Sequence, residues 1–247
     1  MTRFIGRKAL VTGAAGGIGA AILAQLKAEG ATVVGIDRVP PAEPNEAHSW
    51  VSADLQSPLA ARTAVDEAVA ALGGAPDVVV SAAGIYALAP AAAITEADWN
   101  LNQDINLRAP FFVAQAAVAA RDAAGITAPM AIVNIASVGA YRAGTGDAAL
   151  SYQASKAGLV ALTRSMAAEW ARRSIRVNVV SPGVIDTSMV RIMDDPANGQ
   201  AWLDARVPMA RLGRPDEIAS VVCFLASDEA SYVTGAELIA DGGYMCV

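Results

Sequence analysis

Three side chains that can handle a proton or an oxygen atom lie close together along the chain. Tyr152 and Lys156 are four residues apart in SYQASKAGL, and Ser137 lies 15 residues before Tyr152. Residues i and i+4 share one face of a helix, so the ammonium should project beside the phenol. A neighbouring positive charge favours phenolate and is expected to lower the Tyr152 pKa from about 10. Such a phenol can exchange a proton with a substrate oxygen that the Ser137 hydroxyl also holds.

A glycine-rich turn precedes the first helix-like segment. The stretch TGAAGGIG (12–19) contains Gly13, Gly17, Ile18 and Gly19 and follows the apolar run KALVTG. Glycines at such a turn permit a tight bend and close approach of the backbone to a pyrophosphate, and the helix N-terminus offers free N–H groups. The spacing G-x-x-x-G-x-G indicates a dinucleotide site, against the alternative of a glycine-rich turn with no ligand.

Two acidic residues follow the next two strand-like segments. Asp37 ends VVGID, where a carboxylate binds ribose hydroxyls and repels a 2′-phosphate, so it favours NAD. Arg38 follows directly and leaves NADP open, because a guanidinium can bind that phosphate. Asp54, in SADL, is expected either to contact the adenine or to cap the following helix.

Strand-like and helix-like segments alternate along all 247 residues. This alternation predicts a parallel sheet with helices on both faces, and nothing resembles a linker or a repeat. Strands are expected at 8–13, 31–37, 49–55, 77–84, 130–137, 175–183 and 236–243, and helices near 17–29, 58–72, 98–123, 150–173 and 215–226. The Pro-rich stretch 39–47 shortens one crossover. The 184–214 region has no strand pattern and is interpreted as a substrate lid.

Composition excludes several classes of protein. The formal net charge of −6 argues against a nucleic-acid partner. No apolar run reaches the roughly 18 residues of a membrane span, and no signal peptide is recognisable, so a cytoplasmic protein is expected. Cys223 and Cys246 form neither a disulfide framework nor a zinc site. His48 is interpreted as a solvated loop residue, and no metal site is predicted.

These features together resemble the short-chain dehydrogenase/reductase family, along essentially the whole chain. The motifs that carry the resemblance are TGAAGGIG, Asp54-Leu55, SAAG (81–84), Asn106, Ser137 with Tyr152 and Lys156, and SPGVIDT (181–187). The resemblance implies an α/β fold: a single Rossmann domain over 1–247 with a doubly wound, seven-stranded parallel sheet. It also implies reversible hydride transfer between a nicotinamide and an alcohol or carbonyl, in a homotetramer.

The resemblance also implies a role for each matching position. Tyr152 is similar to the family's general acid/base, and Lys156 to the residue that lowers its pKa and binds the nicotinamide ribose. Ser137 resembles the donor to the substrate oxygen, and Asn106 the residue that holds a water between Lys156 and solvent. The cofactor residues implied are Gly13, Gly17, Ile18, Gly19, Asp37, Asp54, Leu55, Ala82, Ala83, Gly84, Tyr152, Lys156, Pro182, Gly183, Ile185 and Thr187.

The sequence departs from the family pattern at three places, of which the segment between Ser137 and Tyr152 borders the substrate pocket in the family. Ser81 replaces the usual asparagine, and its hydroxyl is expected to keep the strand contacts. The segment between Ser137 and Tyr152 is two residues longer than is usual, and the 39–47 loop is short.

The sequence therefore predicts an NAD-dependent dehydrogenase of a small secondary alcohol, a polyol or the matching ketone. One alternative is a 3-oxoacyl-carrier-protein reductase using NADPH, for which Arg172, Arg173 and Arg176 would supply a basic docking surface. A second alternative is a non-catalytic NAD-binding sensor, which would have no need of an acid/base. The expected substrate pocket includes Tyr86 and the 139–151 loop.

Overall fold

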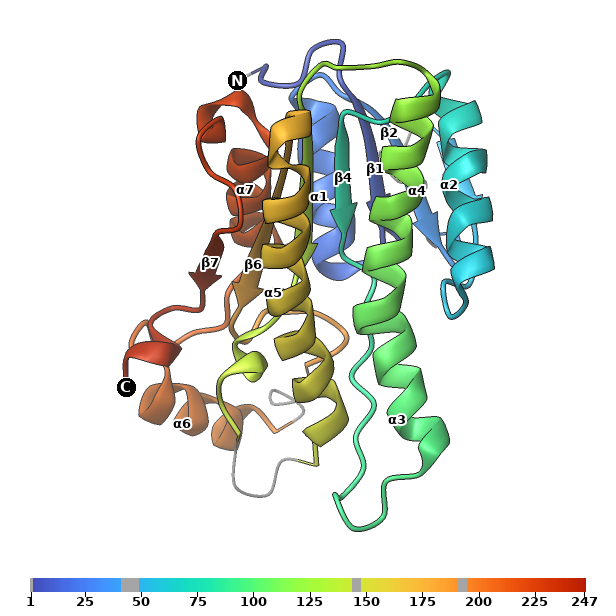
Figure 1. Ribbon diagram of the computed structural model, residues 1–247. Helices are drawn as coiled ribbons and strands as arrows, with labels where there is room; N and C mark the ends of the chain where they lie inside the picture. Colours follow the sequence, from blue (N-terminus) through green and yellow to red (C-terminus); the bar gives the residue numbers. More distant parts are fainter. Residues whose placement is uncertain (1, 41–48, 144–147, 191–194) are drawn as a thin grey trace.

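The computed structural model describes residues 2–40, 49–143, 148–190 and 195–247, and within them a seven-stranded parallel sheet carries helices on both faces (Figure 1). The strand order is β3-β2-β1-β4-β5-β6-β7. The strands are β1 (Lys8–Thr12), β2 (Thr32–Asp37), β3 (Ser49–Ser52), β4 (Val78–Ser81), β5 (Met130–Ile135), β6 (Ile175–Pro182) and β7 (Glu237–Ala240). The helices are α1 (Gly17–Ala28), α2 (Pro58–Leu72), α3 (Glu96–Gln103), α4 (Ala109–Ala123), α5 (Leu150–Trp170), α6 (Pro196–Arg206) and α7 (Pro215–Ala226).

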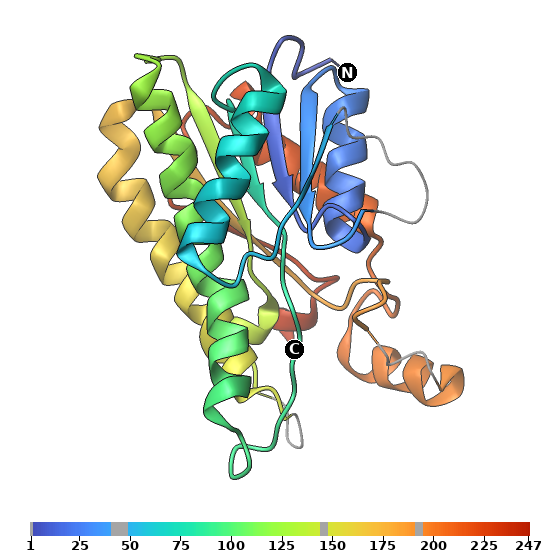
Figure 2. The ribbon, with the colours of Figure 1, turned by 90° about the vertical axis from the view of Figure 1, so that its right-hand side faces the viewer.

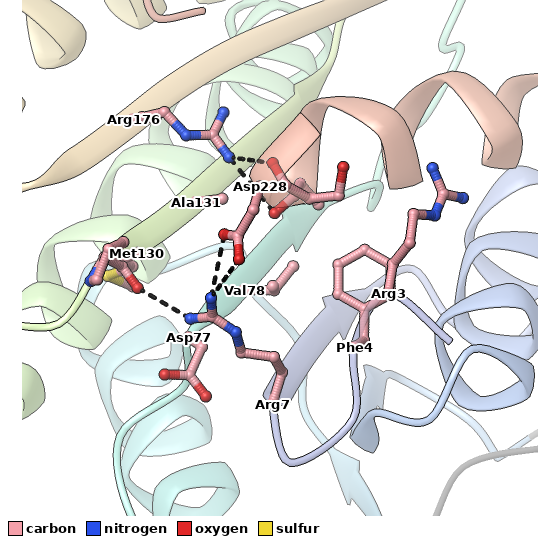
Figure 3. Close-up of a pocket in the computed structure, with 12 residues that line it drawn as sticks. Arg3, Phe4, Arg7, Asp77, Val78, Met130, Ala131, Arg176 and Asp228 are labelled. Carbon is pink, nitrogen blue, oxygen red and sulfur yellow. Dashed lines mark hydrogen bonds and ion pairs between the residues drawn. The ribbon is translucent and has the colours of Figure 1, made fainter. Parts of the chain in front are cut away.

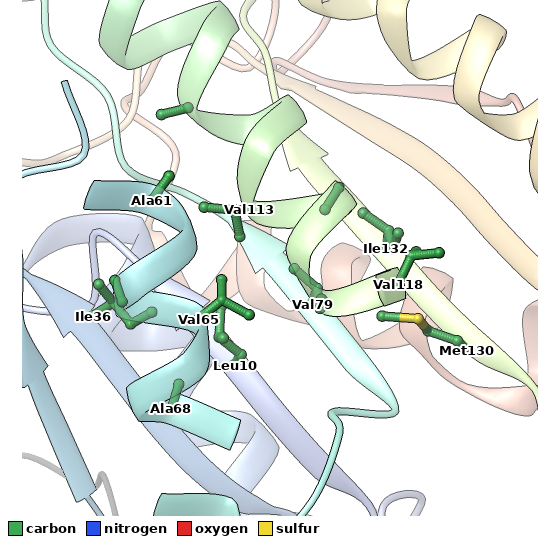
Figure 4. Close-up of a cluster of buried hydrophobic side chains, with 14 of the residues drawn as sticks. Leu10, Ile36, Ala61, Val65, Ala68, Val79, Val113, Val118, Met130 and Ile132 are labelled. Atoms are coloured by element: carbon green, nitrogen blue, oxygen red, sulfur yellow. The ribbon is translucent and has the colours of Figure 1, made fainter. Parts of the chain in front are cut away.

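The two faces of the sheet bury separate apolar clusters. Alternate strand residues such as Leu10 and Val79 pack under α2 and α4 (Figure 4). Their neighbours Val11 and Val80 point to the opposite face, which α1 and α7 cover. Since helices cover both faces, the strands can be apolar throughout, and every residue of β4 is buried. The predicted doubly wound α/β architecture is confirmed, and Figure 2 shows its layers from the side.

The order in which the strands are added to the sheet reverses between β1 and β4. The chain leaves β1 through α1 on one face of the sheet and leaves β4 through α3 and α4 on the other. A crevice forms at the carboxyl ends of the strands where such crossovers diverge, and ligands of open α/β sheets bind there. The segments that follow β1, β2, β4, β5 and β6 all meet at this edge, and they contain most of the predicted site residues.

The opposite edge of the sheet is closed by a network of charged residues. Arg3, Arg7 and Arg176 surround a cavity of only about 10 Å³ near the start of β4 and β5 (Figure 3). Arg176 donates to the carbonyl oxygens of Leu225 at 2.7 Å and Ser227 at 2.9 Å, which satisfies the C-terminal end of α7. This edge therefore stabilises the fold and leaves room for about one water molecule.

One expectation about the elements needs correction. The stretch expected to be helical over 98–123 is helical from Glu96 to Ala123, but a π-helical turn at Asp104–Arg108 separates α3 from α4. The region 184–214, for which no strand was expected, contains the helix α6. Most of the 39–47 loop lies outside the described residues, as does His48. Among the described residues, no helix combines the length and apolarity needed to cross a bilayer.

Candidate active site

The glycine-rich turn between β1 and α1 is so tightly packed that two of its glycines leave no room for a side chain. Gly13 has a positive φ of 69°, and a Cβ there would lie 2.6 Å from the backbone nitrogen of Ala83. A Cβ on Gly19 would lie 2.1 Å from the carbonyl oxygen of Gly13. α1 begins at Gly17 with no side-chain cap, and Ile18 packs against the core beneath. The turn thus presents backbone donors and a helix N-terminus, which suit the phosphates of a dinucleotide.

Asp37 lies at the end of β2, directly beside this turn. Its carboxylate accepts hydrogen bonds from the backbone N–H groups of Ala15 at 3.1 Å and of Arg38 at 2.7 Å. The two bonds hold a negative charge at the position where a ribose is expected. Neither Ala14 nor Ala15 brings a basic side chain to the loop.

Asp54 lies farther out, after β3. Its carboxylate accepts hydrogen bonds from the backbone N–H of Gln56 at 3.1 Å and from the side-chain amide at 3.0 Å. The helix-cap alternative is wrong, because the N-cap of α2 is Ser57, whose side chain accepts from Ala60. Asp54 instead lines an open cavity of about 380 Å³, whereas Leu55 is buried in the core. An adenine contact for Asp54 is compatible with this geometry.

The segment after β4 joins the glycine-rich turn to the rest of the site. The backbone N–H of Ala83 donates to the Thr12 hydroxyl at 3.2 Å, and Ala82 and Ala83 pack on opposite faces of the sheet. Ser81 does not keep the expected strand contacts, since its buried hydroxyl has no hydrogen-bond partner among the described residues. A serine side chain is shorter than that of an asparagine, which explains why it does not reach the neighbouring strands.

Asn106, Ser137, Tyr152 and Lys156 gather around Gly84. A Cβ on Gly84 would lie 3.3 Å from Oδ1 of Asn106 and 3.4 Å from Nζ of Lys156. The Lys156 Nζ lies 5.9 Å from the centroid of the Tyr152 ring. A Cβ on Gly139 would lie 3.3 Å from both the Ser137 hydroxyl oxygen and Cε1 of Tyr152, so these two side chains lie close together. Residues from three separate elements therefore reach one small volume at the carboxyl edge of the sheet.

Asn106 owes its position to the π-helical turn that contains it. The side chain is fully buried and forms two hydrogen bonds with the backbone of Ile85: Oδ1 accepts from the N–H at 2.9 Å and Nδ2 donates to the carbonyl at 3.0 Å. The paired bonds fix the chain next to Gly84. A single π turn inside an α-helix is rare and occurs frequently at functional sites.

Lys156 is 5% exposed and its Nζ donates to the carbonyl oxygen of Ile135 at 2.8 Å. Burial removes hydration from the ammonium and lowers the Lys156 pKa to about 8. Burial likewise raises the Tyr152 pKa above 10, and the hydrogen bond with Ser137 only partly offsets that rise. For the protein without its cofactor, this direction is opposite to the expected lowering of the Tyr152 pKa, and loss of hydration is its largest cause.

The segment after β6 lies next to the glycine-rich turn and forms that side of the site. Pro182 ends β6, and Gly183 passes so close to a loop that a Cβ on it would lie 2.7 Å from the Cα atom of Asp241. Ile185 is buried, and the Thr187 methyl group lies 3.2 Å from where a Cβ on Gly17 would be. The structure thus brings Thr187 to the glycine-rich turn, from 170 positions away in the sequence.

Several buried polar residues in this region were not singled out from the sequence. Asn102 and Ser155 are both fully buried, and Ser151 is 1% exposed. One signal was available, since Asn102 precedes Asn106 by four residues and so shares its helical face. No cluster of three His, Cys, Asp or Glu side chains that could hold a metal occurs within the described ranges.

Comparisons with known proteins agree with this geometry. A family model described as enoyl-(acyl carrier protein) reductase matches residues 13–245. D-threitol dehydrogenase of Mycolicibacterium smegmatis is 40% identical over 253 residues, which cover 98% of this chain and 94% of that protein. The L-tagatose-forming galactitol 2-dehydrogenase of Cereibacter sphaeroides is 38% identical over 253 residues, covering 98% and 96%.

A solved structure is similar over the full length of both chains. It is described as a 2-deoxy-D-gluconate 3-dehydrogenase of Agrobacterium tumefaciens with bound NADP, and it is 37% identical with a TM-score of 0.87. The match covers 100% of each chain. The chain therefore belongs to the short-chain dehydrogenase/reductase family, and it is an oxidoreductase that interconverts alcohols and carbonyl compounds with a nicotinamide cofactor.

Proposed function

We propose that this enzyme transfers a hydride between NAD(H) and a small secondary alcohol, a polyol or the matching ketone. The observation that carries the proposal is the gathering of Tyr152, Ser137 and Lys156 around Gly84, at the same sheet edge as Asp37. When bound, the nicotinamide supplies or accepts the hydride. The remaining chemistry is proton transfer and orientation, which fall to the side chains of the protein.

In alcohol oxidation Tyr152 is the general base that takes the hydroxyl proton. The Ser137 hydroxyl donates to the same oxygen and holds it in place. The Lys156 ammonium stabilises the phenolate, because opposite charges a few ångströms apart favour the ionised form. Asn106 fixes the backbone after Gly84 and holds a water that leads from Lys156 towards solvent. In ketone reduction the proton moves in the opposite direction.

The residues around the glycine-rich turn fit a dinucleotide. The backbone approaches closely at Gly13 and Gly19, where any side chain would collide. We propose NAD over NADP, because a 2′-phosphate would approach the Asp37 carboxylate and find no basic side chain at Ala14 or Ala15. Each 1.4 kcal/mol of such repulsion corresponds to about a tenfold loss of affinity.

The substrate would bind above Gly84, under a lid formed by residues 184–214 of a single domain that spans 1–247. Tyr86 forms one wall: its ring meets the Tyr152 ring edge-on, with centroids 4.7 Å apart. The lid helix α6 contacts the C-terminal segment through Trp202 and Tyr244, whose ring centroids are 5.6 Å apart. We further propose a homotetramer working in the cytoplasm, where the free thiols Cys223 and Cys246 would stay reduced.

A turnover screen tests the proposal. Wild-type enzyme is assayed with NAD and with NADP over D-threitol, galactitol, other secondary alcohols and hydroxy acids, and with a 3-oxoacyl thioester and NADPH. We expect oxidation of a secondary alcohol or polyol, with a higher kcat/KM for NAD. A higher kcat/KM with NADP would contradict the cofactor assignment, even though one solved relative binds NADP. Preferred turnover of the thioester would instead favour the carrier-protein reductase.

A further inference from the structure

Asn102 connects two parts of the active site from beneath. It is fully buried, and its Nδ2 donates to the Ser151 hydroxyl at 2.6 Å and to the carbonyl oxygen of Ala87 at 3.0 Å. Its Oδ1 accepts from Nδ2 of Asn106 at 3.4 Å. One amide thus joins the loop after β4, the π-helical turn and the residue that precedes Tyr152.

The first turn of α5 is held by hydrogen bonds from the neighbouring helix α3. The helix begins at Leu150, and its N-cap residue Ala149 forms no side-chain hydrogen bond. The neighbouring helix α3 does not cap the free N–H groups at this end, but two of its amides donate to Ser151: Asn102 to the hydroxyl and Gln103 to the carbonyl oxygen at 3.0 Å. Since a helix end without a cap frays readily, this attachment to α3 holds the turn that carries Tyr152 in place.

A second chain of bonds reaches Tyr152 through Asn106. The Asn106 amide donates to the Ser155 hydroxyl at 3.2 Å, and that hydroxyl donates to the carbonyl oxygen of Tyr152 at 2.6 Å. Because Asn102 bonds to Asn106 as well as to Ser151, it supports both connections. The backbone of Tyr152 is therefore held from two sides by buried amides.

We propose that Asn102 and Ser151 are positioning residues that set the Tyr152 phenol in register with Ser137 and Lys156. The inference rests on the proposed function, in which Tyr152 moves the proton. Neither residue contacts the reacting atoms. Their contribution is geometric, and a displacement of about 1 Å at a reacting group can cost on the order of 10²-fold in rate.

Ser151→Ala is the sharpest test, because it removes only the hydroxyl that Asn102 bonds. Thr163→Val is its matched control: Thr163 lies on the same helix, is also fully buried, and accepts a hydrogen bond from the Asn134 amide at 2.9 Å. Both variants delete a buried hydroxyl that serves an asparagine, but Thr163 is 11 residues beyond Tyr152. Asn102→Leu removes all the bonds of the amide and should give the larger effect.

We expect Ser151→Ala to lower kcat by about tenfold, within the range for a misplaced reacting group, while the Kd for NADH stays within about twofold. The alkaline rise of alcohol oxidation should move to higher pH, because a displaced phenol interacts less with the Ser137 hydroxyl, which lowers the Tyr152 pKa. Thr163→Val should lose a similar amount of thermal stability. Its kcat should stay within about twofold of the wild-type value and its pH profile should not change, because a substitution at a distant site without shared partners acts independently of Tyr152.

The inference is overturned if Ser151→Ala and Thr163→Val show the same kcat and the same pH profile at comparable loss of Tm. Tyr152→Phe is measured in the same series. If Tyr152→Phe is inactive while the two hydroxyl variants behave alike, only the positioning role fails. If Tyr152→Phe remains active, the proposed function fails with it. Should Asn102→Leu not fold, Ser151→Ala decides the question alone.

Discussion

Tyr152 is half-buried and Lys156 is buried, and neither environment favours the charged form of its side chain. Burial raises the pKa of the phenol and lowers that of the ammonium to about 8. Each shift opposes ionisation, so the phenolate form needs both the Lys156 charge and the Ser137 hydroxyl beside it. A general base of this kind gains activity as pH rises, and alcohol oxidation should therefore accelerate through the alkaline range while ketone reduction slows.

Tyr152→Phe should abolish turnover and leave NADH binding nearly intact. The substitution removes the proton-transfer group, which contributes typically about 10²–10⁴-fold, and it takes away no phosphate contact. Steady-state kinetics and NADH fluorescence titration measure the two effects. Tyr232→Phe, at a fully exposed tyrosine, is the control and should change neither. Retention of more than about a tenth of wild-type kcat by Tyr152→Phe would place the proton on another route.

Lys156→Met should raise the melting temperature at pH 7 although it impairs catalysis. The folded-state pKa of Lys156 is about 8, below the ordinary value of 10.5. The unfolded state therefore binds the proton more tightly, and the cost to stability is full below pH 8 and fades as pH rises to 10.5. The gain should be on the order of 1–3 kcal/mol at pH 7, since each pKa unit is worth about 1.4 kcal/mol.

Thermal unfolding of wild type and Lys156→Met at pH 7 and pH 10 checks this prediction. The stabilisation by Lys156→Met should shrink at the higher pH. A lower melting temperature for Lys156→Met at pH 7 would mean that its bond to Ile135 outweighs the burial cost.

At the scale of elements, the site depends on irregular backbone placed between regular segments. The π turn directs Asn106 at Ile85, and the glycine-rich turn brings β1, α1 and the segment after β4 into contact. The glycine-rich turn tolerates substitution poorly, because backbone atoms rather than flexible side chains form the close contacts at Gly13 and Gly19.

Gly19→Ala should destabilise the fold and weaken cofactor binding together. Its Cβ would lie 2.1 Å from the carbonyl oxygen of Gly13, so α1 must shift away from the turn. Overpacking of this kind costs about 1–3 kcal/mol. Gly16→Ala is the stability control, because a Cβ there would meet nothing within 4 Å and its φ is −166°. Chemical denaturation of both variants should show a loss below about 1 kcal/mol for Gly16→Ala; equal losses would contradict the packing argument.

At the scale of the molecule, the parallel sheet collects residues that are remote in the chain. Every strand delivers its carboxyl end to one edge, so Gly13, Asp37, Gly84 and Ser137 meet there although over 120 positions separate the first from the last. The helices α4 and α5 lie on the same face of the sheet (Figure 1) and carry partly buried apolar residues such as Phe111, Phe112 and Leu162.

A homotetramer is predicted for the enzyme in solution. Helices that are apolar beyond one stripe usually pack on two neighbours, and α4 and α5 carry such partly buried apolar residues in addition to those that face the sheet. Multi-angle light scattering should give four times the chain mass of 25.2 kDa at micromolar concentration. A mass equal to one chain would refute the assembly.

The alternation of strand-like and helix-like segments was enough to predict a parallel sheet with helices on both faces, because secondary structure and parallel crossovers follow from local pattern. The four-residue spacing of Tyr152 and Lys156 likewise placed both on one side of α5. Local sequence contains these relations, since each depends on neighbours a few positions away.

Only the tertiary structure decided how the environment acts on those residues. It raised the Tyr152 pKa where the sequence predicted a lower one, and it joined Asn102 to Ser151 across 49 positions. It also left the Ser81 hydroxyl without a hydrogen-bond partner in the described part of the chain. Burial and contact between distant segments determine each of these outcomes. Both are properties of the packed chain, and no spacing within a single helix or strand reports them.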